Sequence, residues 1–200
     1  MSSSRYDSDL HDDFFREWYQ DDNRKYDVFM SFRGKDTRAS FTSHLYAALK
    51  NAGITVFKDD ETLSRGKHIS HSLRLGIEQS RISVVVFSRN YAESRWCLQE
   101  LEKIMECHRT TGQVVLPVFY DVDPSQVRHQ KGHFGKAFEK LLNTILKEIG
   151  DKWPQVVGWR EALHKATHNQ RCWKNSHVNL WRKGLCEAGG VPVVVVFSSR

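Results

Sequence analysis

The sequence predicts an α/β protein in which a doubly wound parallel sheet of five strands is covered by helices. Short, continuously apolar segments alternate with segments of helical periodicity, and such uninterrupted apolar strands are typical of a sheet buried on both faces. The 200 residues, 40% of them hydrophobic, suit one compact domain. In this fold class ligands bind beyond the carboxyl ends of the strands, so a site is expected in the loops that follow them.

The first half of the chain contains two strand–helix units. After an acidic arm of residues 1–24, interpreted as flexible or loosely docked, YDVFMSF (26–32) predicts a strand. The polar turn RGKDTR then leads to a helix whose apolar residues recur at helical spacing until Gly53: Phe41, Leu45, Ala48, Leu49 and Ala52. ITVF (54–57) predicts the next strand, and a polar loop connects it to a helix over about residues 70–80.

Three further strands are predicted in the second half. ISVVVFS (82–88) precedes a helix that carries Leu98, Leu101, Ile104 and Met105. VVLPVFY (114–120) leads through a polar loop into a helix over roughly 134–149, and VPVVVVF (191–197) predicts the fifth strand. The loops that should share the carboxyl edge of the sheet are 33–38, 58–68, 89–96 and 121–133.

Residues 25–166 are predicted to form the domain, and residues 167–200 an atypical tail. GWREALHKA (158–166) and LWRKGLCEA (180–188) resemble each other, which leaves open a short duplication or an insertion that splits one helix. No helical segment follows the last predicted strand, so the final covering helix is missing and we expect one face of the sheet to be incompletely covered.

Charge and cysteine content narrow the classes of partner and compartment. The formal charge is +6, and residues 25–200 carry +10 from 27 basic and 17 acidic residues, which favours anionic partners without choosing among them. The four cysteines form no CxxC pair and no secretory leader precedes them, so we expect reduced thiols in the cytoplasm or the nucleus. No apolar run is long enough for a bilayer, so no membrane contact is expected.

Several familiar site patterns are incomplete. The pair Gly66-Lys67 lacks the first glycine and the Ser/Thr of a phosphate loop, and neither GxGxxG nor GxSxG occurs. His164, His168 and Cys172 share four-residue spacing but lack a fourth ligand, so no metal site is expected.

Four segments in order carry a resemblance to a known family: YDVFMSFRGKDTRASFTSHLYAAL, GITVFKDDETLSRGKHIS, SRISVVVFSRNYAESRWCLQELEKIMEC and VLPVFYDVDPSQVRHQKGHFGKAF. Together they resemble the plant Toll/interleukin-1 receptor (TIR) domain that opens one class of nucleotide-binding, leucine-rich-repeat disease-resistance receptors, here in a TIR-only or truncated form. The resemblance covers about residues 25–163. It implies a flavodoxin-like sheet and an enzyme that hydrolyses NAD+ in defence and cell-death signalling, releasing nicotinamide and ADP-ribose-type products, with NAD+ or NADP+ as substrate and no resident cofactor.

The resemblance also implies which residues form the site. Glu100, in the WCLQEL segment, matches the catalytic glutamate of the family. Arg65 and Gly66 match positions in a loop that opens and closes over the site, and Trp96 offers an aromatic face to a base or pyridinium ring. The nucleotide-contacting loop corresponds to Phe32, Arg33, Gly34, Lys35, Asp36 and Thr37.

The chemistry suits these residue types. Loss of nicotinamide leaves an oxocarbenium-like ribose, which a carboxylate such as Glu100 stabilises or orients through the ribose hydroxyls. Nicotinamide leaves as a neutral group, so one carboxylate can suffice where ordinary glycosidases use two. Arg33 and Arg65 are suited to the pyrophosphate as charge-assisted donors.

Structural alternatives remain open for each of these residues. Glu100 could simply complement the helix dipole, and Trp96 could be core packing. Cys97 is better interpreted as a small buried residue than as a nucleophile, and Asp36 as a cap of the first helix or its turn.

Two departures from the family pattern bear on function. Lys35 stands where the family usually has an acid, which should alter phosphate attraction more than chemistry. The missing closing helix belongs to the surface through which plant TIR domains self-associate, an assembly on which their activity depends. The rival hypothesis is therefore a non-catalytic module that associates with other TIR domains as helper, adaptor or decoy. Nucleic-acid binding is a weaker possibility that rests on the basic body alone.

Overall fold

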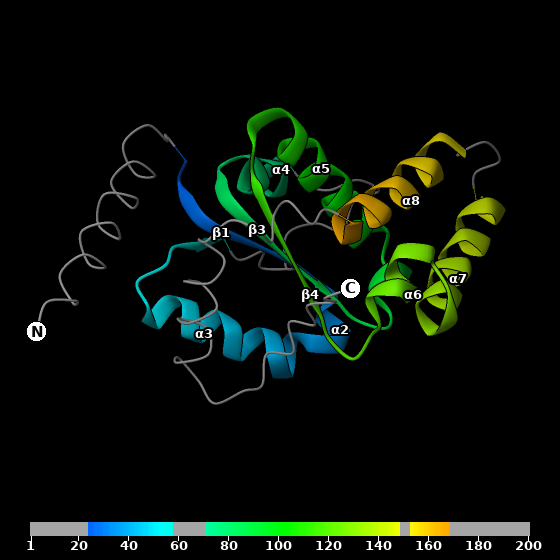
Figure 1. Cartoon of the computed structure of the whole chain (residues 1–200), viewed down its shortest axis with the longest axis horizontal. Helices are drawn as coiled ribbons and strands as arrows, with labels where there is room; N and C mark the ends of the chain where they lie inside the picture. Colours follow the sequence, from blue (N-terminus) through cyan, green and yellow to red (C-terminus); the bar gives the residue numbers. More distant parts are fainter. Residues whose placement is uncertain (1–23, 58–70, 149–152, 169–200) are drawn as a thin grey trace, which may run out of the picture.

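The computed structural model describes residues 24–57, 71–148 and 153–168, and these form a parallel sheet with helices on both faces (Figure 1). The described strands are β1 (Tyr26–Phe32), β2 (Val56–Phe57), β3 (Ser80–Phe87) and β4 (Val114–Phe119), in the order β2-β1-β3-β4. This confirms the predicted α/β class. The fifth strand predicted at 191–197 lies outside the described residues.

The strand order reverses between β1 and β3, because β2 lies on one side of β1 and the chain then crosses over to β3 on the other. All three pairings are parallel, and Phe32 at the end of β1 is level with Val86 near the end of β3. The loops after β1 and β3 therefore diverge from the same edge of the sheet. In doubly wound folds such a switch point is where ligands bind.

Alternate residues of each strand face two different cores, as the pleat requires. On one face Val28 and Met30 of β1 pack with Phe41 and with Leu45 and Leu49 of α3 (Ser43–Asn51). Three residues of β4 are only partly buried against this core: Val114, Leu116 and Val118.

The other face is covered more heavily. Its core joins strand residues such as Phe29 and Val85 to five helices: α4 (His71–Glu78), α5 (Arg95–Thr111), α6 (Pro124–His129), α7 (Gly132–Glu148) and α8 (Trp153–His168). Figure 1 shows α4, α5 and α8 on the opposite side of the sheet from α3. Within the described ranges, no helix is long and apolar enough to cross a membrane.

The first helix begins earlier than its apolar periodicity predicts. The polar segment RGKDTR, expected as a turn, folds into α2 (Gly34–Thr37) and the start of the irregular helix η1 (Arg38–Thr42), with non-helical backbone angles at Ser40. Periodicity missed these turns because Ala39 is their only hydrophobic residue before Phe41. The loop after β1 is therefore short and helical.

The helices after β4 also differ from the predicted boundaries. The expected loop 121–133 contains α6, whose start is capped by Asp123: its carboxylate accepts from the N–H of Ser125 at 2.7 Å, and Pro124 needs no partner for its nitrogen. The next helix, α7, begins at Gly132 rather than about 134. The segment 158–166, one of the two that resemble each other, lies within α8.

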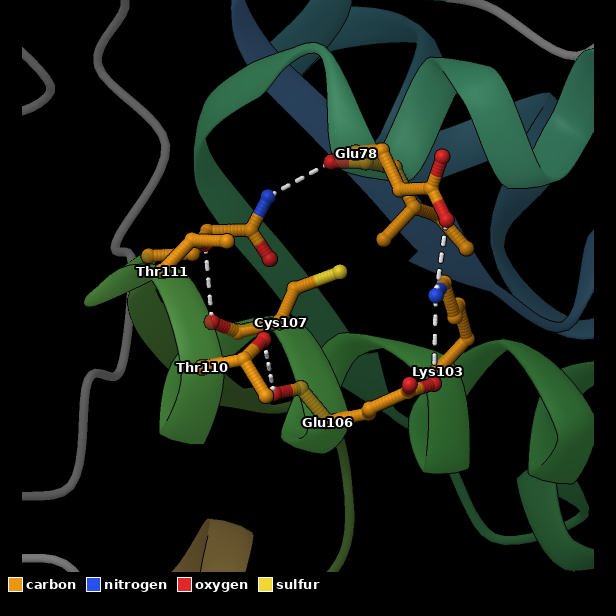
Figure 2. A network of polar contacts seen from close by, with 8 residues as sticks. Glu78, Lys103, Glu106, Cys107, Thr110 and Thr111 are labelled. Carbon is orange, nitrogen blue, oxygen red and sulfur yellow. Dashed lines mark hydrogen bonds and ion pairs between the residues drawn. The ribbon is translucent and has the colours of Figure 1, made fainter.

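A polar network fixes α5 against α4 and the sheet (Figure 2). Lys103 Nζ of α5 lies 2.7 Å from Glu78 Oε1 of α4 and 3.1 Å from Glu106 Oε2. Beyond α5, the buried Gln113 side chain donates to the carbonyl oxygens of Ile77 at 2.7 Å and Ser80 at 2.8 Å. These contacts hold the middle and the C-terminal end of α5 in place.

Candidate functional site

The Glu100 carboxyl lies inside the protein, against the last residues of β1. Its residue is 9% exposed, and the Ser31 hydroxyl donates to Glu100 Oε2 at 2.7 Å. Ser94 caps α5 by accepting from the N–H of Cys97, which places Glu100 in the second turn of the helix. An acid that merely complements the helix dipole would be solvent-exposed, so that interpretation of Glu100 is wrong.

Two hydroxyl groups continue from the Glu100 carboxyl into the core. Ser31 Oγ lies 2.8 Å from the Tyr91 hydroxyl oxygen, and Tyr91 donates to the carbonyl oxygen of Cys97 at 2.9 Å. Tyr91 belongs to the short helix η2 (Tyr91–Glu93), and both hydroxyl-bearing residues have no exposed surface. Burial raises the pKa of Tyr91 well above its usual 10.0. Electrostatic interaction with Cys97 and Glu100 acts in the same direction, and the Ser31 hydrogen bond opposes it.

Neither Ser31 nor Tyr91 was predicted as a site residue. Ser31 sits in an apolar strand and Tyr91 in the polar turn 89–96, where a single hydroxyl carries little signal, and they are separated from each other by 60 residues. The parity of Ser31 with Phe29 on β1 was the one available hint, because it assigns this hydroxyl to the face that the WCLQEL helix covers.

The Asp36 carboxylate joins the loop after β1 to the turn after β3. It accepts a hydrogen bond from Ser88 Oγ at 2.6 Å, from the backbone N–H of Asn90 at 3.1 Å and from Asn90 Nδ2 at 3.3 Å. Its side chain therefore does not cap α2, for which no side-chain cap is present. Asp36 links the two loops that border the switch point.

The rest of the segment 32–37 shows different degrees of exposure. Phe32 and Gly34 are partly buried, Lys35 is exposed, and Thr37 is buried with its hydroxyl donating to the Arg33 carbonyl oxygen at 3.4 Å. Arg33 Nε is buried and has no hydrogen-bond partner among the described residues. A buried guanidinium N–H without a partner is a donor that an anionic group can use.

Trp96 and Cys97 occupy the first turn of α5 with opposite exposures. Trp96 is 37% exposed, so it is not core packing. Cys97 is buried, and its thiol donates to the Phe32 carbonyl oxygen at 3.5 Å, as expected of a small buried residue. Arg65 and Gly66 lie outside the described residues.

The structure thus brings Glu100, Asp36 and the neighbourhood of Trp96 to the carboxyl edge of the sheet at its switch point. The arrangement offers one buried carboxylate, a buried guanidinium N–H and an exposed indole. Within the ranges that the structure describes, no group of three or more His, Cys, Asp or Glu residues is placed to hold a metal ion. A buried carboxylate, an aromatic ring and a guanidinium at the same edge of the sheet are residue types suited to a cationic centre in an anionic ligand.

Sequence comparison identifies a family. A profile of the TIR domain matches residues 25–184. The TMV resistance protein N of Nicotiana glutinosa is 51% identical over 143 residues, covering 72% of this chain and 12% of that protein. The disease resistance protein RPV1 of Vitis rotundifolia is 54% identical over 143 residues, covering 72% and 10% respectively. The chain spans about a tenth of the length of these curated relatives.

Structure comparison agrees. The TIR domains in the structure of the activated Roq1 resistosome, which directly recognizes the pathogen effector XopQ, match this chain with a TM-score of 0.66 and 43% sequence identity. The match covers 82% of this chain and 100% of that chain.

Proposed function

The chain belongs to the TIR domain family and is homologous to plant disease-resistance proteins, and from this premise we propose that it hydrolyses the bond between nicotinamide and ribose in NAD+. The products would be nicotinamide and an ADP-ribose-type signal in plant defence and cell death. NAD+ or NADP+ is the substrate here, and water is the second reactant.

The observation that supports this proposal most is the burial of the Glu100 carboxyl at the switch point of the sheet. As nicotinamide departs, positive charge develops on the ribose, and a carboxylate fixed in a low-dielectric setting stabilises that charge more than one in water. The Ser31 hydrogen bond at 2.7 Å fixes one oxygen of the carboxylate before the substrate arrives. Glu100 is the catalytic residue in this proposal.

Other residues would bind the dinucleotide. The buried Arg33 N–H is suited to the pyrophosphate, and the exposed Trp96 ring to stacking on a base or the pyridinium. Arg65, Gly66 and the segment 32–37 complete the proposed contacts. Lys35 would add positive charge near the phosphates, because its side chain is exposed.

We further propose that self-association controls the activity. The matched TIR domains come from the structure of an activated resistosome, which favours association of TIR domains with one another. If the same holds here, nicotinamide release per molecule should rise with protein concentration, since dimers and larger assemblies form by mass action.

A nicotinamide-release assay tests both proposals. Purified protein at several concentrations is mixed with NAD+, and Glu100→Gln is compared with Glu102→Gln, a matched control two residues further along α5. We expect Glu100→Gln to lower kcat by about 100-fold or more, because the stabilising charge is lost. The control should retain activity.

Two results would contradict the proposal in different ways. Unchanged release by Glu100→Gln would remove Glu100 from its catalytic role. No release by the native protein at any concentration, together with binding to another TIR domain, would support the non-catalytic interaction module.

A further inference from the structure

We propose that Ser31 and Tyr91 are positioning residues that hold one oxygen of the Glu100 carboxyl and set how readily this carboxyl takes up a proton. The consequence for catalysis rests on the proposed function; the proton uptake itself does not. The inference follows from counting hydrogens along a buried chain of oxygens.

The chain has three contacts and two hydroxyl hydrogens. The contacts join Glu100 Oε2 to Ser31 Oγ at 2.7 Å, Ser31 Oγ to the Tyr91 oxygen at 2.8 Å, and the Tyr91 oxygen to the Cys97 carbonyl at 2.9 Å. Ser31 and Tyr91 each supply one hydrogen, and a carbonyl oxygen supplies none. With Glu100 ionised, one of the three short contacts therefore lacks a hydrogen.

Protonation of Glu100 at Oε2 corrects this shortage. The carboxylic acid then donates to Ser31, Ser31 donates to Tyr91, and Tyr91 donates to the Cys97 carbonyl oxygen, so that each contact carries one hydrogen. An unmatched pair of buried oxygens costs free energy, and this cost is removed when Glu100 gains a proton. The unmatched contact between Ser31 and Tyr91 thus favours the protonated carboxyl, whereas the hydrogen that Ser31 donates to the carboxylate favours the ionised form.

The surroundings keep Tyr91 in its protonated state. Burial raises the pKa of Tyr91, and its ionisable neighbours, Cys97 and Glu100, are both on α5. β1 contributes the Ser31 hydroxyl to this row of contacts, and η2 contributes the Tyr91 phenol. Tyr91 therefore contributes its hydrogen throughout the pH range in which a glutamate titrates.

Two conservative substitutions should act in opposite directions. Tyr91→Phe removes one oxygen and one hydrogen, leaving a single contact that the Ser31 hydrogen satisfies with Glu100 ionised; the midpoint of the Glu100 titration should fall by roughly one pH unit. Ser31→Ala removes both the unmatched contact and the hydrogen bond to the carboxylate. The charge-assisted hydrogen bond is the larger effect, so the midpoint should rise by roughly one pH unit. A purely structural role predicts no such opposition.

The titration is followed on the full chain labelled with ¹³C at the glutamate side-chain carboxyl. The Glu100 signal is identified by its loss in Glu100→Gln, and Glu102→Gln serves as a control that should leave its midpoint unchanged. Shifts of opposite sign in Tyr91→Phe and Ser31→Ala support the inference. Shifts of the same sign, or no shift in either variant, overturn it. Thermal unfolding checks that both variants are folded.

Kinetics provide the second readout. The ionised carboxyl is the form that stabilises the ribose cation, so the acid limb of the kcat profile should move with the titration midpoint while KM stays the same, because neither residue touches substrate. An acid limb that stays fixed in both variants contradicts the positioning role. The carboxyl titration needs no substrate, so failure of the proposed NAD+ hydrolysis and failure of this inference give separate results.

Discussion

Glu100 and Glu102 lie two positions apart on α5 but have different surroundings. Glu100 faces β1, whereas Glu102 lines a groove between α5 and α8 together with Gly158, Glu161 and Lys165. Desolvation by the surrounding side chains raises the pKa of Glu102 above 4.5, although the residue as a whole is exposed. The nearby Trp159 indole N–H opposes this shift, but its nitrogen has no hydrogen-bond partner among the described residues. Helix position alone therefore did not determine how an acid on α5 behaves.

The raised pKa of Glu102 predicts a pH-dependent effect on stability. A carboxyl with a raised folded pKa favours the folded state below its unfolded pKa, and this contribution is lost as pH rises through the folded pKa. Glu102→Gln should therefore raise the free energy of unfolding near neutral pH, by less than about 1 kcal/mol because the site is partly solvated. Urea denaturation should show the gain shrinking toward about pH 4.

Glu161 offers the matched control with the opposite sign. Lys165, whose ammonium lies 2.6 Å from Glu161 Oε1, lowers the pKa of this carboxyl. Its small contribution is present above the unfolded pKa and is lost as pH falls through the folded pKa. Glu161→Gln should not stabilise the protein at neutral pH, and an equal gain in both variants would contradict the assignment.

At the same scale, the sequence singled out residues for the candidate site but not the contacts that they make. Glu100 was found through the motif that carries it, but its partner Ser31 is 69 residues away and became visible only when β1 and α5 were placed together. Asp36 was expected to cap a helix or touch a nucleotide; its bonds to Ser88 and Asn90 span more than 50 residues. Such contacts depend on strand order, which local patterns do not contain.

Among the elements, α4 depends on a residue without a side chain. A Cβ at Gly76 would lie 2.7 Å from ring carbons of Phe57, the last described residue of β2. That ring cannot retreat easily, because it packs against Phe29 at 5.7 Å and Tyr26 at 5.1 Å between ring centroids. Gly76 therefore sets how closely α4 approaches β2.

Gly76→Ala should destabilise the protein despite favouring the helix. Alanine improves helix propensity by about 1 kcal/mol, whereas overpacking a tight core costs about 1–3 kcal/mol. We expect a net loss, measured by urea denaturation.

Gly158→Ala on α8 is the comparison for Gly76→Ala. There the added Cβ would meet only the end of the Glu102 side chain, at 2.5 Å, which can rotate away. This variant should be neutral or more stable by up to about 1 kcal/mol, since only the helix propensity changes. Equal destabilisation of both variants would show that the Phe57 ring is not the cause.

The elements also show where periodicity succeeds as a predictor. β1, β3 and β4 are apolar runs bounded by polar loops, and their structures follow the predicted segments closely. α6 was missed because six residues are too few to show a helical period, although Asp123 followed by Pro124 is a recognisable helix start. Capping signals would have found it where periodicity does not.

For the whole molecule, the larger core depends on α8. Trp159 is fully buried and belongs to the core that joins α8 to α5 and the sheet, whereas Val157, two residues earlier on the same helix, is 57% exposed. The fold class was predictable because strand and helix segments alternate. The contribution of α8 to the core was not predictable, since its sequence shows only weak amphipathic patterning before Gly158.

Trp159→Ala should lower the free energy of unfolding by about 3–5 kcal/mol, because a cavity the size of an indole opens in the core. Domains of this kind are stable by only about 5–15 kcal/mol, so the entire sheet should unfold at lower denaturant concentration, as followed by circular dichroism. Val157→Ala should stay within about 0.5 kcal/mol of the parent. A small effect of Trp159→Ala would mean that α8 is not part of the cooperative unit.

The carboxylate of Asp36 couples two segments that lie far apart in the sequence, so that they move together. It accepts hydrogen bonds from the Ser88 hydroxyl and from both the backbone and the side chain of Asn90. If the segment after β1 changes conformation when a ligand binds, the turn after β3 must therefore move as well. A residue inserted in either segment would therefore displace the other segment.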